Sequence, residues 1–319
     1  MTGKSVETSG VKRLKRLLLE HGSTPIFADI WSGYARPALE FRHDGTDTRD
    51  TTELGCTKLG GVPDLEVGAD WPVRQAYDAR SLNEYSPESG RFARPLAFLA
   101  QVSLTDVEQQ GGCGLSLPEA GLLQVFYDTE VQPWGYRPGH RIGTVVRYVP
   151  PGSDLIRARL PDSDWPLVDP VAKVCLAPAA SLPHWRWLEC ETTENLGWTE
   201  DAFFEELDQV DEDIFEMLTY PRHMMGGWPA LEQLSPIEPQ CEFVSGGQEA
   251  EKMPELDDEQ WKALRCKAQA WRQLFQLGGD ENTLDWTGGD TSVHLYMMIR
   301  DRDIGSLSFD KAHAVFQCT

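Results

Sequence analysis

One set of elements occurs twice in the same order along this 319-residue chain, and it constrains the fold more than any other feature. GGVP at 60–63 is followed by FLAQ at 98–101 and by the apolar run LLQVFY at 122–127. GGWP at 226–229 is followed by LFQ at 274–276 and by VHLYMM at 293–298. Each set reads as a Gly-Gly-x-Pro turn, a strand that ends in glutamine, a glycine-containing loop and an apolar strand. The order predicts an internal duplication, with pseudo-repeats at about 55–150 and 220–317.

Short runs rich in β-branched and aromatic residues occur through much of the chain, bounded by Gly, Pro or Asp. Such runs predict strands, here at 24–31, 37–42, 95–102, 121–128, 142–149 and 292–299. Helices are expected from Thr199, from Asp257, where Gln260 completes a capping box, and after Ser308. Strands and helices do not alternate strictly, which favours an α+β fold with mixed or antiparallel sheets, flanking helices and two pseudo-repeated halves packed as one unit. The polar segment 73–94 reads as a long surface loop.

The segment VKRLKRLLLEHG at 11–22 is basic in a chain that is otherwise acidic. Its four basic residues oppose only Glu20, while Val11, Leu14, Leu17 and Leu18 share one helical face. We expect a basic helix within 1–22 that docks through this apolar stripe, followed by an α+β domain over 23–319. Contact with a membrane or RNA is the alternative use of the basic face.

The formal net charge of −22 at pH 7 limits the possible partners. A polyanion repels phosphate backbones and anionic membranes and attracts basic proteins, so we expect neither nucleic acid nor a membrane as partner. The chain has no run of about 18 apolar residues and no signal peptide, and its seven cysteines are scattered without C-x-x-C spacing. These features predict a cytoplasmic location with reduced thiols. They do not define an oligomeric state.

Standard catalytic and cofactor motifs are missing from the sequence, including the nucleophile elbow, the phosphate-binding loop and H-E-x-x-H. The loop GDENTLDWTGGD at 279–290 carries Asp280, Glu281, Asp285 and Asp290. Their carboxylate oxygens could hold calcium, and the favoured alternative is a solvated turn between two strands. The loop does not match an EF-hand, because Leu284 stands at the fifth position and Asp285 at the sixth, where glycine is needed. We therefore expect no cofactor and no metal, and we assign no catalytic residue.

Polar and aromatic residues near the two turns are candidates for a cleft between the pseudo-repeats. His223 stands beside the second turn and could serve as a general base with a nearby carboxylate. Trp228 lies inside that turn, where an aromatic side chain either packs in the core or lines a groove. The alternative for both residues is a purely structural role. The possible cleft comprises His223, Trp228, Gln101, Gln276, Asp280 and Asp285.

The segment TEDAFFEELDQVDEDIFEML at 199–218 predicts a helix with one apolar and one acidic face. It has nine acidic residues and no basic one. Like charges four residues apart cost roughly 0.2–0.5 kcal/mol per pair, so the acidic face does not serve helix stability. It is either a docking face for a basic partner or a solvated surface that promotes solubility. The candidate partner-binding residues are Asp201, Glu205, Asp208, Glu212 and Glu216.

Five segments, taken together and in order, resemble the YwqG-like family of bacterial domains of unknown function. They are CTKLGGVPDLEVGADWP at 56–72, PLAFLAQVSL at 95–104, LPEAGLLQVFYD at 117–128, HMMGGWPALEQ at 223–233 and the segment 271–304. The resemblance covers roughly 27–317 and implies a single compact α+β unit with pseudo-repeated halves, without known catalytic residues. Cys56, where the family usually has serine, and the loop at 73–94 depart from its pattern. Some members have been suggested to act as immunity proteins beside secreted toxins.

Two classes of function follow. The favoured one is a non-enzymatic acidic protein-binding module, for example an immunity-type protein that neutralises a basic partner or toxin, with fast and salt-sensitive association. The alternative is an enzyme or small-ligand binder that uses a cleft between the two pseudo-repeats.

Overall fold

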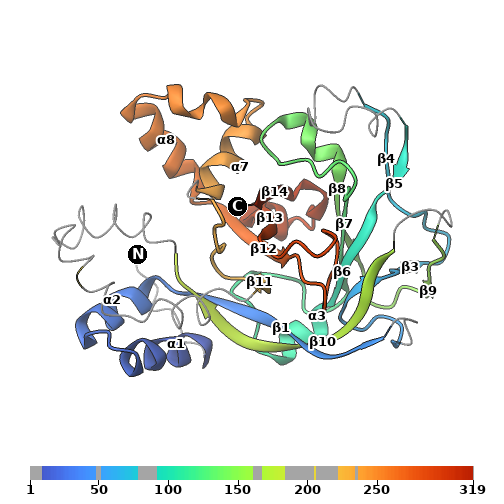
Figure 1. Cartoon of the computed structure of the whole chain (residues 1–319), viewed down its shortest axis with the longest axis horizontal. Coiled ribbons are helices and arrows are strands. Elements are labelled where there is room, and N and C mark those ends of the chain that lie inside the picture. Colours follow the sequence, from blue (N-terminus) through green and yellow to red (C-terminus); the bar gives the residue numbers. More distant parts are fainter. Residues whose placement is uncertain are drawn as a thin grey trace.

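The computed structural model describes residues 9–47, 52–77, 92–160, 167–183, 205, 222–233 and 236–318. Its centre is one ten-stranded sheet in the order β14-β13-β12-β11-β1-β10-β2-β6-β7-β8, and all of its strand pairs are antiparallel (Figure 1). The strands are β1 (Arg36–Asp47), β2 (Lys58–Gly61), β6 (Ala97–Ser103), β7 (Leu122–Tyr127), β8 (Thr144–Val149), β10 (Val168–Ser181), β11 (His223–Gly226), β12 (Trp271–Gly278), β13 (Val293–Arg300) and β14 (His313–Cys318).

Four strands on each side of this sheet flank a central pair of long strands. We call β2, β6, β7 and β8 the first strand group and β11, β12, β13 and β14 the second strand group. The central strands β1 and β10 pair from Arg36 opposite Ser181 to Asp47 opposite Val171. β1, which precedes the first strand group in the sequence, pairs with β11 of the second group. β10, which follows the first strand group in the sequence, pairs with β2 of that group.

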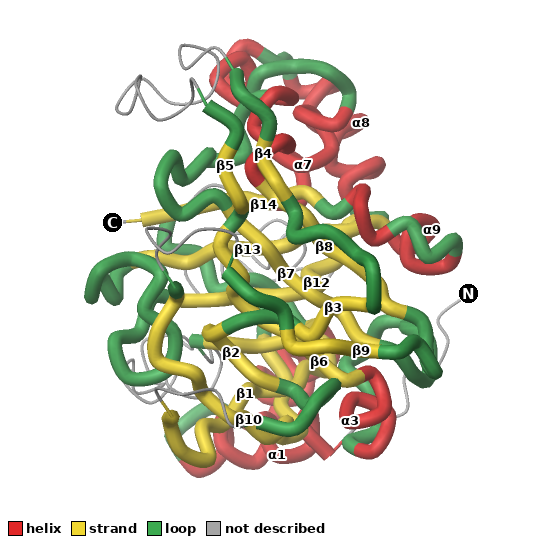
Figure 2. Tube along the Cα trace, turned by 90° about the vertical axis from the view of Figure 1, so that its right-hand side faces the viewer, coloured by secondary structure: helices red, strands yellow, loops and turns green. Residues whose placement is uncertain are grey.

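The sheet curls until its two ends nearly meet, as Figure 2 shows. The connection between β7 and β8, which contains the 3-10 helix η3 (Pro138–Gly143), reaches β14. There Phe316 N donates to Trp134 O at 3.3 Å. On the far side of the gap, Tyr148 of β8 packs against Phe309 of the 3-10 helix η6 (Phe309–Lys311), with ring centroids 5.7 Å apart. The result is a nearly closed antiparallel sheet.

Alternate side chains of the strands fill the space inside the curl, because successive residues of a strand point to opposite faces. Leu39, Leu99, Leu123, Met297 and Phe275 belong to this main core and are fully buried. Burial of such side chains contributes about 1.5–3 kcal/mol each.

Two helices lie at the lower left of the molecule in Figure 1, against the central strands. α1 (Ser9–Glu20) packs Val11, Leu14 and Leu18 against α2 (Pro25–Tyr34) and the end of β10. A helix is therefore present within 1–22, and three of the four residues of the predicted stripe are buried, while Leu17 is only partly buried.

The prediction of a strand at 24–31 is wrong, because this segment forms α2. The side-chain oxygen of Thr24 accepts from Phe27 N, and Pro25 occupies the first helical position, where its missing N–H costs nothing. Phe27 and Trp31 then fall on one buried face at helical spacing.

The prediction of a helix after Ser308 is also wrong. A single 3-10 turn, η6, is followed by β14, which pairs with β13 along its whole length. Phe309, Ala312 and Phe316 are buried. A short apolar run does not by itself distinguish a strand from a helix. Pairing with β13 makes residues 313–318 a strand.

The remaining elements lie at the periphery. The predicted capping box of Asp257 and Gln260 is present at the start of α8 (Asp258–Ala268), which contacts α7 (Ile237–Ser245) above the second strand group (Figure 1). The ends of the predicted loop at 73–94 pair as a small ribbon, β4 (Val73–Arg74) with β5 (Arg94–Pro95). The other elements are β3 (Asp64–Glu66) with β9 (Leu155–Arg157), α3 (Leu104–Gln109), α9 (Asp301–Gly305) and the 3-10 helix η5 (Ala250–Glu255).

Candidate functional site

The connection between β12 and β13, residues 279–292, forms an anchored acidic loop. Leu284 and Trp286 insert into the main core, and Trp286 Nε1 donates to Gly278 O at 2.9 Å. Two aspartates fix its turns: Asp280 Oδ1 accepts from Asn282 N, and Asp290 Oδ1 accepts from Ser292 N, each at 2.9 Å. We name residues 279–292 the acidic loop.

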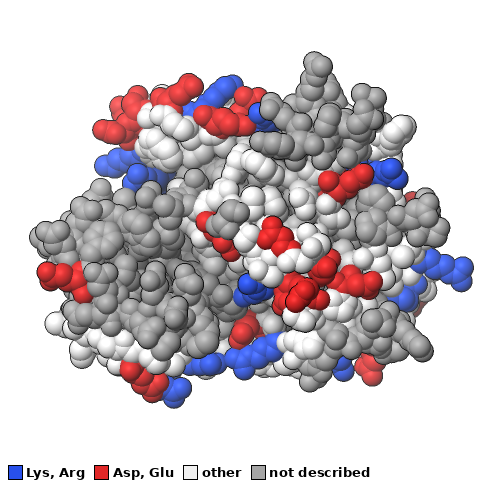
Figure 3. Space-filling model, in the orientation of Figure 1, with Lys and Arg blue, Asp and Glu red and all other residues white. Residues whose placement is uncertain are grey.

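The acidic loop presents its carboxylates at the surface. Figure 3 shows Asp and Glu side chains gathered over the middle of one face, where Figure 1 places β12, β13 and their connection. Glu281 and Asp290 are exposed, and Asp285 is half-buried. Hydrogen bonds from the side chain and backbone of Ser292 lower the pKa of Asp290. Within the described part of the chain, none of these three acids forms an ion pair.

His223 lies beneath the first residues of the acidic loop. Its Nε2 lies 3.9 Å from Asp280 Oδ2, and the residue is 5% exposed. Burial lowers the pKa of His223, so the ring is neutral near pH 7. Its proximity to Asp280, with the amide of Asn282, holds the pKa of that carboxyl well below its usual range. The predicted neighbourhood of a histidine and a carboxylate is therefore present.

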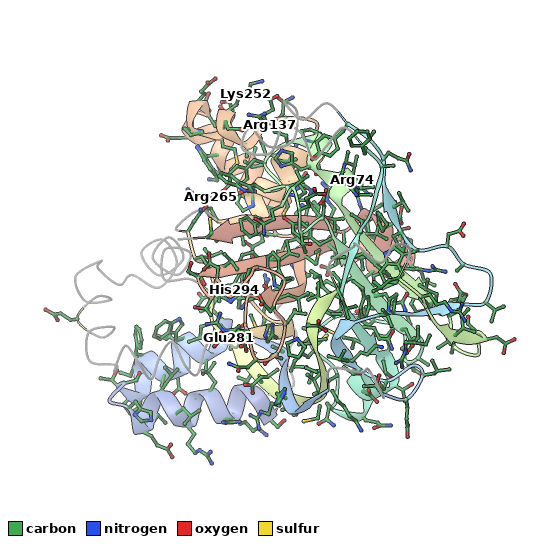
Figure 4. The ribbon with its side chains drawn as sticks, turned by 45° about the vertical axis from the view of Figure 1, so that its right-hand side comes forward. Arg74, Arg137, Lys252, Arg265, Glu281 and His294 are labelled. Carbon is green, nitrogen blue, oxygen red and sulfur yellow. The ribbon has the colours of Figure 1, made fainter. Side chains whose placement is uncertain are left out.

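A second histidine and carboxylate occur nearby. His294, the second residue of β13, places Nδ1 2.5 Å from Glu232 Oε1. This contact lowers the pKa of Glu232. His294 is 7% exposed, and Figure 4 places it at the same end of the sheet as Glu281 of the acidic loop. The sequence analysis did not select His294, although its position within an apolar strand marked it as an unusual buried polar residue.

Strand register separates the two histidines. His223 pairs with Leu277 and His294 pairs with Gly278, which are successive residues of β12. Paired residues share a face of the sheet, whereas successive residues point to opposite faces. His223 therefore points towards the main core side and His294 towards the outer side. Gly278 between them is closely packed, since a Cβ there would lie 2.4 Å from Cγ of Arg222.

Both histidines have unused hydrogen-bonding capacity. No described residue forms a hydrogen bond with either ring nitrogen of His223, nor with Nε2 of His294. A buried polar group without a partner costs about 1–3 kcal/mol. A small polar ligand or an ordered water could therefore form hydrogen bonds with these nitrogens.

Gln101 and Gln276 each bind the backbone directly after a Gly-Gly-x-Pro turn. Gln101 Oε1 accepts from Asp64 N at 3.0 Å, and Gln276 Oε1 accepts from Ala230 N at 2.8 Å. Both side chains are fully buried. Four strands lie between β6, which carries Gln101, and β12, which carries Gln276. The structure thus brings His223 and Asp280 together, places Gln276 on the opposite face of the sheet from His223, and places Gln101 elsewhere.

The other two candidates of the predicted cleft face different neighbours. Trp228 Nε1 donates to Tyr34 O at 2.8 Å, and the guanidinium of Arg36 lies 3.1 Å from its ring centroid. Trp228 therefore joins the second turn to the end of α2 and the start of β1. Asp285 N donates to Asp169 O at 2.9 Å, and Asp285 Oδ1 accepts from Gly289 N at 2.7 Å. Asp285 thereby shapes the acidic loop.

The predicted acidic helix at 199–218 lies outside the described residues except at one position. Glu205 is helical and exposed. Asp201, Asp208, Glu212 and Glu216 lie outside the described residues.

A buried charged network in the first strand group escaped the sequence analysis. Lys58 and Asp64 are both 0% exposed, with Nζ and Oδ1 4.0 Å apart. Lys58 Nζ donates to Val62 O at 2.6 Å, and Asp64 also pairs with Arg157 Nε at 2.5 Å. Gln101 Nε2 donates to Asp64 Oδ2 at 2.6 Å. The one available signal was a lysine directly before the apolar Leu-Gly-Gly of the first turn.

The described residues contain neither a metal-binding cluster nor a membrane-spanning helix. Within the described ranges, no three His, Cys, Asp or Glu side chains gather closely enough to hold a metal ion. In the same ranges, no helix is both long and apolar enough to cross a membrane.

These observations define an α+β protein with a large, nearly closed antiparallel sheet and an anchored acidic loop at one end of it. Residues 57–318 match the family described as domain of unknown function DUF1963. The chain therefore belongs to that family. No curated protein matches it. The matched range omits β1, although β1 is one of the two central strands of the sheet.

Proposed function

We propose that this protein is a non-enzymatic binding module that recognises a basic protein, of the kind in which an immunity protein neutralises a toxin. The observation that carries the proposal is the acidic loop, whose exposed carboxylates form no ion pair with a described residue, although Arg222 donates to Gly279 O and Thr291 O of the loop backbone. The net charge of −22 adds a long-range field of the same sign. The acidic face predicted at Asp201, Glu205, Asp208, Glu212 and Glu216 would extend this surface.

The anchoring of the acidic loop suits it to recognition. Leu284 and Trp286 hold it from within, and aspartate-capped turns set its backbone. A partner would therefore meet charges that are already placed, with little ordering cost on binding. Charges of this kind increase the association rate and make it fall with ionic strength.

A pull-down with charge-reversal variants tests the proposal. The tagged full chain is incubated with extract of the cells that produce it, at low and at high salt, and retained proteins are identified by mass spectrometry. Glu281→Lys reverses an exposed charge of the acidic loop. Glu259→Lys makes the same change in net charge on α8, where Glu259 is also exposed. A basic protein held by wild type and Glu259→Lys, released by salt and lost with Glu281→Lys, is the expected result. Retention that is equal for all three proteins contradicts the proposal.

A second function, small-ligand binding with or without catalysis, is favoured by the two histidines. His294 beside Glu232 resembles a base held by a carboxylate, with Nε2 left as acceptor. Ligand-free nuclear magnetic resonance spectra of the imidazoles, compared with spectra after adding cell metabolites, test this function. Shifts confined to His223 and His294 support it, and unchanged shifts contradict it.

We also infer that the two strand groups derive from one duplicated unit, as the order of their sequence elements predicts. The equivalent bonds of Gln101 and Gln276 after the two turns support this origin. Likeness to the YwqG-like family and a cytoplasmic location stay part of the same proposal. The described cysteines are all free, as expected in a reducing compartment.

A further inference from the structure

The seam that nearly closes the sheet is built around two buried histidines. We use the word seam for the contact of residues 133–141 with β14. Gly135 approaches β14 so closely that a Cβ there would lie 2.1 Å from Ala314 O. His313 Nε2 lies 2.9 Å from Gly135 O. Beyond the seam, Ala250 N of η5 donates to Tyr136 O at 2.8 Å.

His140 holds the seam from the side of the β7–β8 connection. Its Nδ1 accepts two backbone N–H groups, from Gly135 at 2.8 Å and from Tyr136 at 3.2 Å. An imidazole nitrogen can accept only while it carries no proton. The bonds to Gly135 and Tyr136 therefore require neutral His140. A proton on Nδ1 would meet two N–H donors at short range.

His313 depends on its neutral form in a related way. The ring is 4% exposed and packs edge-on against Trp271, with centroids 6.4 Å apart. Its contact with Gly135 O uses Nε2 as donor, so Nδ1 is the unprotonated nitrogen. Charging this ring would bury a cation beside Trp271.

Positively charged groups around the seam also favour the neutral forms of His140 and His313. Arg137 and His313 lie near His140, and Arg141 and Arg300 lie near His313. Arg137 is paired with Glu251 of η5 at 3.0 Å, and Figure 4 shows Arg137 beside Lys252 of that element. Arg300 is paired with Glu242 of α7 at 2.6 Å. No described acid lies in an ion pair with either histidine. Burial, and to a lesser extent these cations, lower the pKa of His140 and of His313 to about 4.

We propose that the seam is an acid-sensitive latch, in which a proton taken up at Nδ1 of His140 expels the amides of Gly135 and Tyr136 and releases the β7–β8 connection from β14. The proton comes from solvent, and no covalent bond changes. Release would uncover Ala314 and Phe316 of the main core.

The direction of the pH dependence follows from the lowered pKa values. In the unfolded or open chain each histidine titrates near 6.5, and in the closed seam near 4. The open form thus binds protons first as pH falls. The stability of the seam is fully present above about pH 6.5 and is lost progressively as the pH falls towards 4.

Hydrogen exchange of the full chain, followed by mass spectrometry between pH 7.5 and 4, tests the latch. Exchange of peptides from 133–141 and 313–318 is corrected for the intrinsic pH effect and compared with a peptide from β6 and β7. His140→Asn keeps an acceptor, Oδ1, near the place of Nδ1 but does not titrate. His43→Asn is the matched control, because His43 is exposed on β1, remote from the seam.

Acid-induced exchange at the seam, before the β6–β7 peptide responds, is expected for wild type and His43→Asn and not for His140→Asn. The latch is refuted if the seam stays protected until the whole chain unfolds, or if His140→Asn opens at the same pH as wild type. Should His140→Asn fold poorly, direct titration of the His140 ring in wild type decides the matter. A ring that protonates near pH 6.5 without loss of seam protection also refutes it.

Discussion

The two strand groups share one buried hydrogen bond and differ in the residues that surround it. In each, a buried glutamine accepts the amide that follows a Gly-Gly-x-Pro turn. In the first group, the residue paired with that glutamine is Lys58 and the residue after the turn is Asp64, both buried charges. In the second group, the corresponding residues are Met224 and Ala230. The first group thus encloses its charges, whereas the second encloses apolar side chains.

The difference extends to the connection between the two middle strands of each group. In the first group this connection contains α3, and Asp106 there accepts from Thr57 Oγ1 at 2.5 Å. In the second group it is the acidic loop, with carboxylates at the surface. At this connection the first group binds its own residues, whereas the second group presents charge outward. The second group is the better place to look for a partner.

The largest expected effect comes from breaking the enclosed charges. Asp64→Ala leaves Lys58 and Arg157 without their carboxylate, which should lower the free energy of unfolding by about 3–5 kcal/mol. Urea denaturation measures the loss. Glu66→Ala, which removes a half-exposed partner of Arg147, should cost under about 1 kcal/mol.

A double variant sharpens the comparison between the groups. Lys58→Met with Asp64→Ala installs the residues that the second group has at the same places. Because the buried ammonium is removed together with its counter-ion, the double variant should be more stable than Asp64→Ala alone. If the double variant lost as much stability, relative to wild type, as Lys58→Met and Asp64→Ala together, the groups would not be interchangeable at these positions.

The next effect concerns the glutamines themselves. Gln276→Leu leaves the amide of Ala230 buried without an acceptor, which should cost about 1–3 kcal/mol. Gln101→Leu should cost more, because Gln101 also donates to Asp64 and to Cys56 O. Thermal unfolding compares them with Gln109→Leu, an exposed position on α3. Equal losses for Gln101 and Gln276 would speak against the additional role of Gln101.

The smallest expected loss of stability concerns α8, which lies between β11 and β12 in the sequence. Asp257→Ala removes both the side-chain bond to Gln260 N and the capping box of α8. The expected loss is about 1 kcal/mol, read from urea denaturation. Asp258→Ala serves as the control, because Asp258 lies in the same first turn of α8 but takes no part in the capping box. A loss as large for Asp258→Ala would point to helix-dipole charge as the cause.

The sequence predicted those parts of the fold whose signals are local. The capping box at Asp257 and the apolar runs of β6, β7, β8 and β13 were found because each element carries its own pattern. β10 was missed, since its alanines and its prolines Pro170 and Pro178 give no strand pattern, and pairing with β1 supplies what propensity does not. α2 was mistaken because Phe27 and Trp31 suit a strand as well as a helix.

The candidate site was predictable to a similar degree. His223 and Asp280 were placed together correctly because both belong to the second strand group. Gln101 was grouped with them on the similarity of the repeated elements, but repetition in sequence does not place two elements side by side. The insertion of β1 and β10 between the groups keeps them apart. His294 and Lys58 were missed because burial of a single polar residue depends on packing from distant segments.

Association kinetics with the retained basic protein test the central claim, that the acidic loop directs recognition. Rate constants are measured against ionic strength for wild type, Glu281→Lys and Glu259→Lys. The account predicts a steep salt dependence for wild type, a several-fold slower association at low salt for Glu281→Lys that converges with wild type at high salt, and a much smaller change for Glu259→Lys. Identical salt dependence for the two charge reversals would show that only net charge matters and would contradict the assignment of the acidic loop.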